Sequence, residues 1–293
     1  MKWYTPYLQV YNKPLAEVPK TVIEEVRIKL QQLQSDTPLV TVALIGYNEE
    51  KHLLACLWSL SNMQCKYPVE IIGVDNESKD RTAEIFDRTG VPYYTEHQHS
   101  CGFARLCGLN RARGKYHINI DSDTMYPPRY VETLIHALER PGIVAVSSLW
   151  SYIPDKEHSW LALKGYEFAR DVHLYLQSFQ RPELSIRGLV FAYRTDEARK
   201  VGIRTDIIRG EDGSLALGLK KYGKIAFVRQ RKARAVTGYG TVGADGSLLS
   251  SFLTRAIKAL KGFSSLFTKK EVYQDKDSNL IQTHENKNTL RQK

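Results

Sequence analysis

Short apolar runs alternate with amphipathic segments through the middle of the chain. The runs are typical of buried strands and lie at residues 39–45, 69–74, 92–95, 116–120 and 143–148. Helices are expected between them, beginning near Leu53, extending from Ser78 to Gly90, covering 103–112, and extending from Pro127 to Arg140. This alternation predicts an α/β fold in which a mostly parallel, doubly wound sheet carries helices on both faces. Ligands of such folds bind outside the carboxyl ends of the strands.

The pattern changes on either side of this region. Residues 21–34 have the periodicity of an amphipathic helix, with capping-box spacing between Thr21 and Glu24, and we expect it to pack outside the main domain. After residue 150 we expect a helix at 160–179, a strand at 184–193, a helix at 212–221 and a strand at 225–228. No linker separates the two halves, so they are interpreted as one domain with a nucleotide half and a smaller, mixed acceptor half.

The last part of the chain is basic and then polar. Residues 252–270 contain five basic residues and no acidic one, and Leu253, Ile257, Leu260, Ser264 and Phe267 share one helical face. The segment is either a basic amphipathic helix on a membrane surface or a terminal helix docked on the sheet. Residues 271–293 are expected to be disordered. The predicted division is an extension at 1–36, a main domain at 37–250 and a tail at 251–293.

Composition restricts the class of protein. With 293 residues, 42% hydrophobic and 25% charged, the chain is typical of a soluble globular protein and unlike a collagen or a disulfide scaffold. No apolar run reaches about 18 residues and the N-terminus lacks an apolar signal core, so a cytoplasmic protein without a membrane-spanning helix is expected. The four cysteines form no C-x-x-C pair. His97, His99, Cys101 and Cys107 could bind zinc, but their spacing favours a loop followed by a helix.

The formal net charge of +10 is concentrated after residue 180. Residues 181–240 alone carry 14 basic and 6 acidic residues. Clustered positive charge attracts nucleic acids, anionic membranes or phosphate-bearing ligands, and charge alone does not choose among them.

Acidic residues occur where a doubly wound sheet binds its ligand. Asp75 ends the second predicted strand, Asp121 and Asp123 follow the fourth, and Glu211 and Asp212 begin a later helix. Two acids that flank one residue can offer hard oxygen ligands to Mg²⁺ or Mn²⁺, which then bridges substrate phosphates. Another carboxylate nearby can act as a general base. Each feature alone is as well explained by a capped turn or a favourable helix-dipole contact, but their combination and order are specific.

Four longer motifs carry a family resemblance. VTVALIGYNEE, EIIGVDNESKDRT, GFARLCGLNRARGKYHINIDSDT and GEDGSLALGLKKYGKIAFV occur in this order within residues 38–230. They resemble the family 2 glycosyltransferases, inverting enzymes of the GT-A fold, and in particular members that act in bacterial surface-polysaccharide synthesis. SIRGLVFAY resembles the acceptor-side loop of the family, in which Gly188 either lets the backbone approach the donor sugar or forms a bulge.

The resemblance implies roles in donor binding. Tyr47 and Glu49 would line the nucleotide pocket, and Asp75 and Arg105 would contact the base, typically uracil. Asp121 would contact the ribose or belong to the metal shell.

It likewise implies the metal ligand and the acceptor-side acids. Asp123 would coordinate Mn²⁺ or Mg²⁺, which balances the charge of the leaving diphosphate. Asp212 would be the general base, and Glu211 would position the acceptor. Basic residues that could assist the leaving group follow the last predicted strand, at Arg229, Arg231, Lys232 and Arg234.

The resemblance implies transfer of one sugar from a nucleotide-sugar to a glycan or lipid-linked acceptor, at the inner face of the cell membrane. The sequence departs from the family at Leu106, where Asn is frequent, and at Ser214, where a second Asp is usual. No His lies between His173 and His284 to complete the metal site, and Ala233 replaces the Arg of the processive Q-x-x-R-W motif. We therefore expect a non-processive enzyme. The alternatives are an inactive relative that binds a partner, a nucleotidyltransferase, or a nucleic-acid-binding protein, for which no motif is present.

Overall fold

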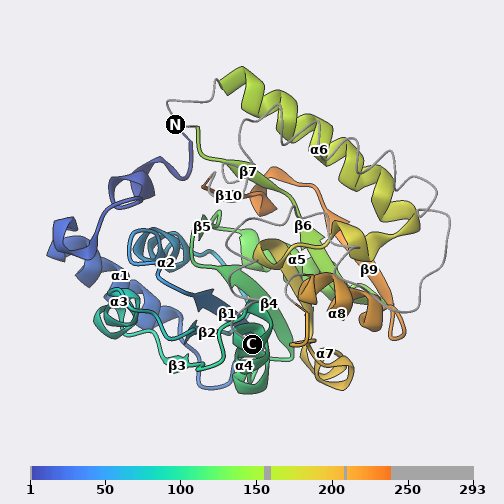
Figure 1. Ribbon diagram of the computed structural model, residues 1–293, viewed down its shortest axis with the longest axis horizontal. Coiled ribbons are helices and arrows are strands. Elements are labelled where there is room, and N and C mark those ends of the chain that lie inside the picture. Colours follow the sequence, from blue (N-terminus) through green and yellow to red (C-terminus); the bar gives the residue numbers. More distant parts are fainter. Residues whose placement is uncertain (1, 155–159, 208–209, 239–293) are drawn as a thin grey trace.

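A seven-stranded sheet forms the centre of the molecule (Figure 1). The computed structural model describes residues 2–154, 160–207 and 210–238. The strand order is β3-β2-β1-β4-β8-β6-β9, and every neighbouring pair is parallel except the two that include β8. The strands are β1 (Val40–Gly46), β2 (Val69–Asp75), β3 (Tyr93–Thr95), β4 (Tyr116–Asp121), β6 (Ile143–Ser148), β8 (Phe191–Arg194) and β9 (Lys224–Val228). The predicted α/β fold with a mostly parallel sheet is confirmed.

A second, three-stranded sheet of order β5-β10-β7 was not expected from the sequence. Its strands are β5 (Thr124–Met125), β7 (Trp150–Tyr152) and β10 (Ala235–Thr237). β10 pairs antiparallel with β5 and parallel with β7. Strands of two or three residues are too short for an alternating apolar pattern to predict them. Through β5, this sheet holds the segment that directly follows Asp123.

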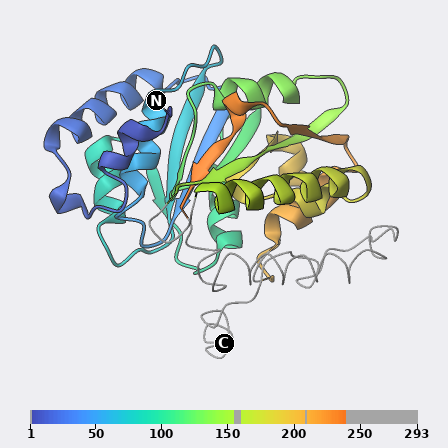
Figure 2. The ribbon, with the colours of Figure 1, turned by 90° about the horizontal axis from the view of Figure 1, so that it is seen from above.

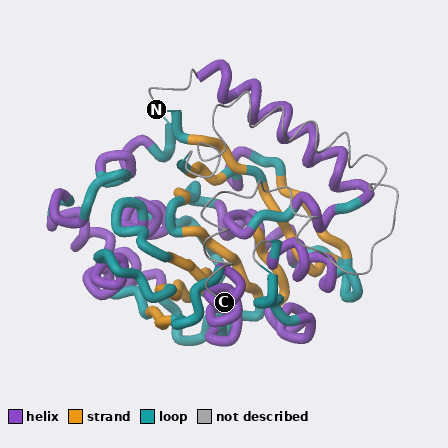
Figure 3. The backbone as a smooth tube through the Cα atoms, viewed as in Figure 1, coloured by secondary structure: helices purple, strands orange, loops and turns teal. Residues whose placement is uncertain are grey.

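Helices cover both faces of the large sheet, as the tube in Figure 3 and the view from above in Figure 2 show. They are α1 (Lys20–Leu33), α2 (Leu53–Ser61), α3 (Thr82–Thr89), α4 (Cys101–Arg111), α5 (Tyr130–Leu138), α6 (Trp160–Gln180), α7 (Thr195–Val201) and α8 (Glu211–Leu219). Gly108 lets α4 lie directly on the sheet, since a Cβ there would lie 3.3 Å from that of Ala43. No helix in the described ranges is long and apolar enough to span a bilayer.

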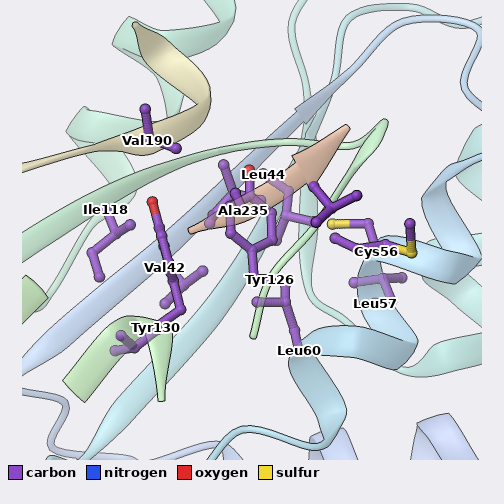
Figure 4. Packing of buried hydrophobic residues seen from close by; sticks show 14 of the residues in the cluster. Val42, Leu44, Cys56, Leu57, Leu60, Ile118, Tyr126, Tyr130, Val190 and Ala235 are labelled. Carbon is purple, nitrogen blue, oxygen red and sulfur yellow. The ribbon is translucent and has the colours of Figure 1, made fainter. Parts of the chain in front are cut away.

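The two faces of the sheet belong to two hydrophobic clusters. Successive side chains of a strand point to opposite faces. Val42, Leu44 and Ile118 therefore pack with α2 in the larger cluster, of which Figure 4 shows a part. Phe191 and Tyr193 of β8 belong to the smaller cluster with α7 and α8. Buried apolar area of this size is the main stabilising contribution to the fold.

The N-terminal residues add to the larger cluster. Tyr7 lies in a 3₁₀-helix, and its ring contacts Trp58 of α2 at a centroid distance of 5.4 Å. The expected amphipathic helix is α1, but it begins after Pro19 without a side-chain cap. The capping-box prediction is wrong because Glu24 forms an ion pair with Arg27 instead.

Other helix ends also differ from the predictions. Helix α3 begins at Thr82, because the Asp80 carboxylate, and not Ser78, accepts a hydrogen bond at 2.9 Å from the first helical amide. Gly90 ends this helix as expected, in the left-handed region with φ of 69°. Helix α5 begins at Tyr130, two residues after the proline pair.

The strand predicted at 184–193 is mostly wrong. Residues Pro182–Ser185 and Gly188–Val190 form 3₁₀-helices, and the strand β8 includes only Phe191–Arg194. Helix α7 follows at once and was missed. The apolar residues of 184–193 suggested a strand, but they are apolar because these turns are buried, with Val190 in the larger hydrophobic cluster and Ile186 in the smaller one. The two segments 252–270 and 271–293 lie outside the described residues. The domain boundaries at 36 and 250 remain predictions.

Candidate active site

Three parallel strands bring the predicted donor-side residues to one edge. In the register of the sheet, Gly46 lies opposite Asp75 and Ile45 lies opposite Asp121. The carboxyl ends of β1, β2 and β4 therefore meet, and the loops that follow them share this edge. This is the edge at which doubly wound sheets bind ligands.

The loops after β1 and β2 are bonded to one another. Asn48 takes the left-handed conformation with φ of 56°, its amide donates to Ser78 Oγ at 2.9 Å, and its Oδ1 accepts from the Lys79 amide at 2.8 Å. The neighbouring Tyr47 ring is half exposed and contacts the His99 ring at 5.5 Å. These bonds hold an exposed aromatic ring above the strand ends.

Asp75 is buried at the end of β2. Its carboxylate accepts from the Ser78 amide at 3.3 Å, so a local turn accounts for part of its role. Beyond it, Glu77 contacts His97 Nδ1 at 3.2 Å and His99 Nε2 at 2.9 Å. The segment from His97 to Cys107 was expected to be a loop followed by a helix. The helix is present, because α4 begins at Cys101.

Glu49, Asp121 and Asp123, which we call the strand-end acids, lie close enough to interact electrostatically. Glu49 contacts His52 Nδ1 at 2.7 Å, and Asp123 Oδ1 accepts from Thr124 Oγ1 at 2.8 Å. Burial raises the pKa of Asp123 to about 7, and the charges of Asp121 and Glu49 act in the same direction. Removing carboxylates from water without a matching cation is unfavourable.

The strand-end acids fit a divalent metal in their chemistry and charge. Carboxylate oxygens are the ligands of Mg²⁺ and Mn²⁺, which need one or two of them and complete their shell with water and substrate phosphates. Among the described residues, no three His, Cys, Asp or Glu side chains form a ready-made metal-binding group. The arrangement thus suits a metal that arrives with a phosphate ligand better than a closed structural site.

Arg105 of α4 is buried next to these acids. Its Nη1 donates to the Ile120 carbonyl at 3.0 Å, and its Nη2 forms an ion pair with Asp121. Its Nε has no hydrogen-bond partner within the described ranges. The charges of Asp121 and Asp212 both raise the pKa of Arg105, against the effect of burial. The guanidinium therefore has carboxylates from two different elements as neighbours.

Glu211 and Asp212, which we call the helix-start acids, are also electrostatic neighbours of Arg105. They occupy the first turn of α8, after Gly210 with φ of 98°. Asp212 Oδ1 accepts from Asn119 Nδ2 at 3.0 Å, and burial raises the pKa of Asp212 while Arg105 and Asn119 oppose that shift. Burial and the charge of Asp212 raise the pKa of Glu211 to about 7.

The sequence reasoning missed the support beneath Asp212. Asn119 lies within β4 and accepts at Oδ1 from the Tyr193 hydroxyl at 3.0 Å, and the Tyr193 ring stacks on His117 with a centroid distance of 5.0 Å. All three side chains are buried. His117 and Asn119 occupy alternate positions of an otherwise apolar strand. This pattern could have indicated a buried polar contact, because buried polar groups require partners.

The side chains around residue 188 explain why a glycine occupies this position. A Cβ at residue 188 would lie 2.5 Å from Arg105 Nη2 and would also overlap the Asp212 carboxylate. The structure therefore brings together Arg105, Asp121, Glu211 and Asp212, with Asp123 and Glu49 beside Asp121. Tyr47 and Asp75 occupy the outer part of the same edge.

The basic residues proposed to assist the leaving group lie elsewhere. Arg229 lies over the Tyr175 ring of α6 at 4.5 Å, and Arg234 forms an ion pair with Asp171 of the same helix. Arg231 and Lys232 follow in an exposed turn. These contacts place the basic segment beside α6.

Comparison with known proteins identifies the family of the chain. The model of the glycosyl transferase family 2 matches residues 41–200, more than half of the chain, and the protein therefore belongs to this family. A relative is the glycosyltransferase GlyA of Streptococcus pneumoniae, 29% identical over 189 residues, which are 60% of this chain and 27% of GlyA. The chain spans between 27% and 45% of the length of three of the curated relatives it matches.

Solved structures show the same fold. The mannosyltransferase PcManGT of Pyrobaculum calidifontis, in complex with GDP-Man and Mn²⁺, has a TM-score of 0.56 at 16% identity and covers 81% of this chain and 72% of its own. The glucosyl-3-phosphoglycerate synthase of Mycobacterium tuberculosis, in complex with Mn²⁺, UDP-glucose and phosphoglyceric acid, has a TM-score of 0.52 at 21% identity, with 85% of each chain covered. The GT-A fold is thus established.

Proposed function

We propose that the protein is an inverting, metal-dependent glycosyltransferase that moves one sugar from a nucleoside diphosphate donor to an acceptor hydroxyl. The observation that carries this proposal is that Arg105 is a neighbour of both acid groups, through Asp121 of the strand-end acids and Asp212 of the helix-start acids. The strand-end acids lie beside the edge where the donor is expected, and Asp212 is held separately by Asn119 at 3.0 Å. A displacement with inversion needs two such groups, one for the leaving diphosphate and one for the attacking hydroxyl.

On the donor side, Tyr47 would contact the nucleotide base and Asp75 would accept a hydrogen bond from it. Tyr47 is suited to stacking because its ring is half exposed, and Asp75 because it lies buried at the strand end. Asp123, with Asp121, would hold Mn²⁺ or Mg²⁺, which supplies positive charge for the diphosphate when bound. Glu49 would set the position of the nucleotide loop through its bond to His52.

On the acceptor side, Asp212 would act as the general base. The acceptor oxygen attacks the anomeric carbon, the bond from that carbon to the diphosphate oxygen breaks, and the hydroxyl proton passes to the Asp212 carboxylate. Asn119 holds one carboxylate oxygen, so the proton is expected at the other. A well-placed base contributes roughly 10²–10⁴-fold to the rate. Glu211, buried beside Asp212, would position the acceptor.

Arg105 would stabilise the ionised forms of its neighbours. Its guanidinium lowers the pKa of Asp212, which keeps the base available for protons. Contact between Arg105 and the donor base, as the family resemblance implies, would require the guanidinium to leave Asp121. We propose instead that Arg105 acts by holding Asp121 and Asp212 apart.

The test is donor hydrolysis and sugar transfer by the purified full-length chain with UDP-glucose, UDP-N-acetylglucosamine and GDP-mannose, each with and without Mn²⁺. A panel of simple glycoside acceptors would report transfer, and release of the nucleoside diphosphate would report turnover. We expect turnover with one donor class, dependent on Mn²⁺ and lost in Asp212→Asn. Nucleotide binding without turnover in the wild type for any donor would favour an inactive relative and contradict the proposal.

A further inference from the structure

Helix α6 directs three of its four Asp, Glu, Arg and Lys side chains, those of Glu167, Arg170 and Asp171, towards the body of the protein. The buried Glu167 carboxylate accepts from the Tyr152 amide at 2.8 Å and from Ser151 Oγ at 3.1 Å, both in β7. The Arg170 guanidinium lies over the Trp150 ring, 4.2 Å from its centroid. Leu163, Tyr166 and Leu174 of α6 are also buried, so this helix carries apolar residues on its outer side as well as on its inner side.

Large apolar side chains occur on the outer side of α6 from its first turn to its last. Phe168 is 73% exposed and Phe179 is 66% exposed. The exposed large hydrophobic residues that share this side, which we call the α6 stripe, are Leu161, Phe168, Val172, Tyr175, Leu176 and Phe179. At 100° per residue they fall within about one third of the circumference of the helix. Figure 1 shows that α6 lies at the periphery of the molecule. A contiguous exposed apolar patch marks an interaction site.

Exposed cations border the stripe. Arg229 stacks on Tyr175 at 4.5 Å and donates to Ser178 Oγ at 3.2 Å, and Arg234 forms an ion pair with Asp171. These contacts fix the segment 229–234 along the second half of α6. Arg229, Arg231 and Lys232, which we call the basic edge, are all exposed there.

We propose that the α6 stripe and the basic edge bind the surface of an anionic lipid bilayer, with α6 lying in the plane of the interface. Aromatic and aliphatic side chains beside Arg and Lys are the combination that enters the boundary between headgroups and acyl chains. Lipid fits the charge better than a second copy of the chain does. Both acids of α6, Glu167 and Asp171, are engaged on the inner side, so the stripe offers no acid to the basic edge of another copy.

The test is flotation of the full-length chain with phosphatidylcholine vesicles, with and without phosphatidylserine. The wild type is expected to bind the anionic vesicles and to dissociate as salt is added, because exposed charges are screened. Phe168→Ser with Phe179→Ser is expected to weaken binding at least tenfold. Arg231→Glu with Lys232→Glu is expected to weaken vesicle binding about fivefold or more for each cation removed. This effect is expected only with vesicles that contain phosphatidylserine.

Matched variants separate the surface from general effects. Ile28→Ser with Tyr222→Ser removes two hydrophobic residues that are 46% and 47% exposed on other elements. Lys13→Glu with Lys20→Glu reverses two exposed charges near the N-terminus. Both controls are expected to bind as the wild type does, and the melting temperature of each variant shows that it is folded.

Two results would overturn the proposal. Wild-type binding by the Phe168/Phe179 variant would assign lipid binding to another part of the chain, such as 252–270, which is present in every variant. Absence of vesicle binding together with a concentration-dependent dimer that Phe168→Ser disrupts would assign the α6 stripe to a second copy. Neither experiment requires a donor or an acceptor, so this inference stands or fails independently of the proposed activity.

Discussion

Asp123 of the strand-end acids and Asp212 of the helix-start acids are both buried and differ in how their charge is balanced. Burial and the charge of Asp121 raise the pKa of Asp212, but a buried amide donor and the nearby guanidinium oppose that rise. Asp123 has a hydroxyl donor and two neighbouring acids, and its pKa is raised to about 7. The protein thus supplies an amide and a guanidinium for the Asp212 carboxylate and leaves the Asp123 carboxylate in need of a cation. We interpret the first as a base and the second as a metal ligand.

The largest expected effect comes from removing the base. Asp212→Asn keeps the shape and the bond to Asn119 but cannot accept the proton, so turnover should fall by roughly 10²–10⁴-fold. Nucleotide affinity, measured by calorimetry, should stay within about twofold, because affinity belongs to the strand-end acids. Asp196→Asn on the exposed surface of α7 is the control. Equal loss of affinity and turnover would contradict the separation of the two groups.

A methyl group added at residue 188 should disturb both Arg105 and Asp212. In Gly188→Ala the new Cβ would overlap Asp212 and Arg105, and displacement of a reacting group by about 1 Å can cost about 10²-fold in rate. Gly165→Ala is the matched change, because a Cβ there meets no atom within 4 Å. The measurement is turnover of the two alanine variants side by side. Full activity of Gly188→Ala would show that the contact is not needed.

Asn119→Leu should change the base without removing it. The Asn119 amide lowers the pKa of Asp212, so its loss should raise that pKa and move the acidic limb of the pH–rate profile to higher pH. The rate on the plateau should fall about tenfold, since a hydrogen bond to a buried charged group is worth roughly 1.5–3 kcal/mol. Tyr193→Phe, one bond further away, should have a smaller effect in the same direction. An unshifted profile in Asn119→Leu would remove Asn119 from the mechanism.

The smallest expected effect concerns stability beneath the helix-start acids. Burial lowers the pKa of His117 to about 3 from an ordinary value of 6.5. The unfolded chain therefore binds a proton that the folded protein does not, and stability contributed by neutral His117 is lost as pH falls from about 6.5 towards 3. At pH 5 this amounts to about 2 kcal/mol. His117→Phe should lose correspondingly less stability between pH 7.5 and pH 5 in urea unfolding, and an identical loss would contradict the assignment.

The sequence predicted the donor half of the fold well because its elements are regular. The strands β1, β2, β4 and β6 each differ by at most one residue from the apolar runs that predicted them. The acceptor half was predicted poorly between residues 182 and 201, where short buried turns replace a regular strand. Such turns are set by tertiary contacts, and local periodicity carries no signal for them.

Some features of the candidate site could likewise be predicted from the sequence and others could not. The acids could be located from the sequence because they follow strands or begin a helix. The roles assigned to Tyr47, Glu49, Asp75 and the acids remain predictions from the family resemblance. The bond from Asn119 to Asp212, and the position of Arg105 beside two acids, depend on packing of β4 against α8 and α4. Residues that are distant in sequence meet there, and one sequence alone does not indicate their pairing.

The measurement that tests the central claim most directly is calorimetric titration of UDP and GDP into the full-length chain, with and without Mn²⁺, at pH 8 and pH 6. We predict that one nucleotide binds in the presence of Mn²⁺, and that binding weakens below pH 7, because a proton on Asp123 competes with the metal. Asp123→Asn should abolish the dependence on Mn²⁺, while Asp36→Asn, on the exposed surface, should not. Binding that is independent of Mn²⁺, or unchanged in Asp123→Asn, would contradict the account.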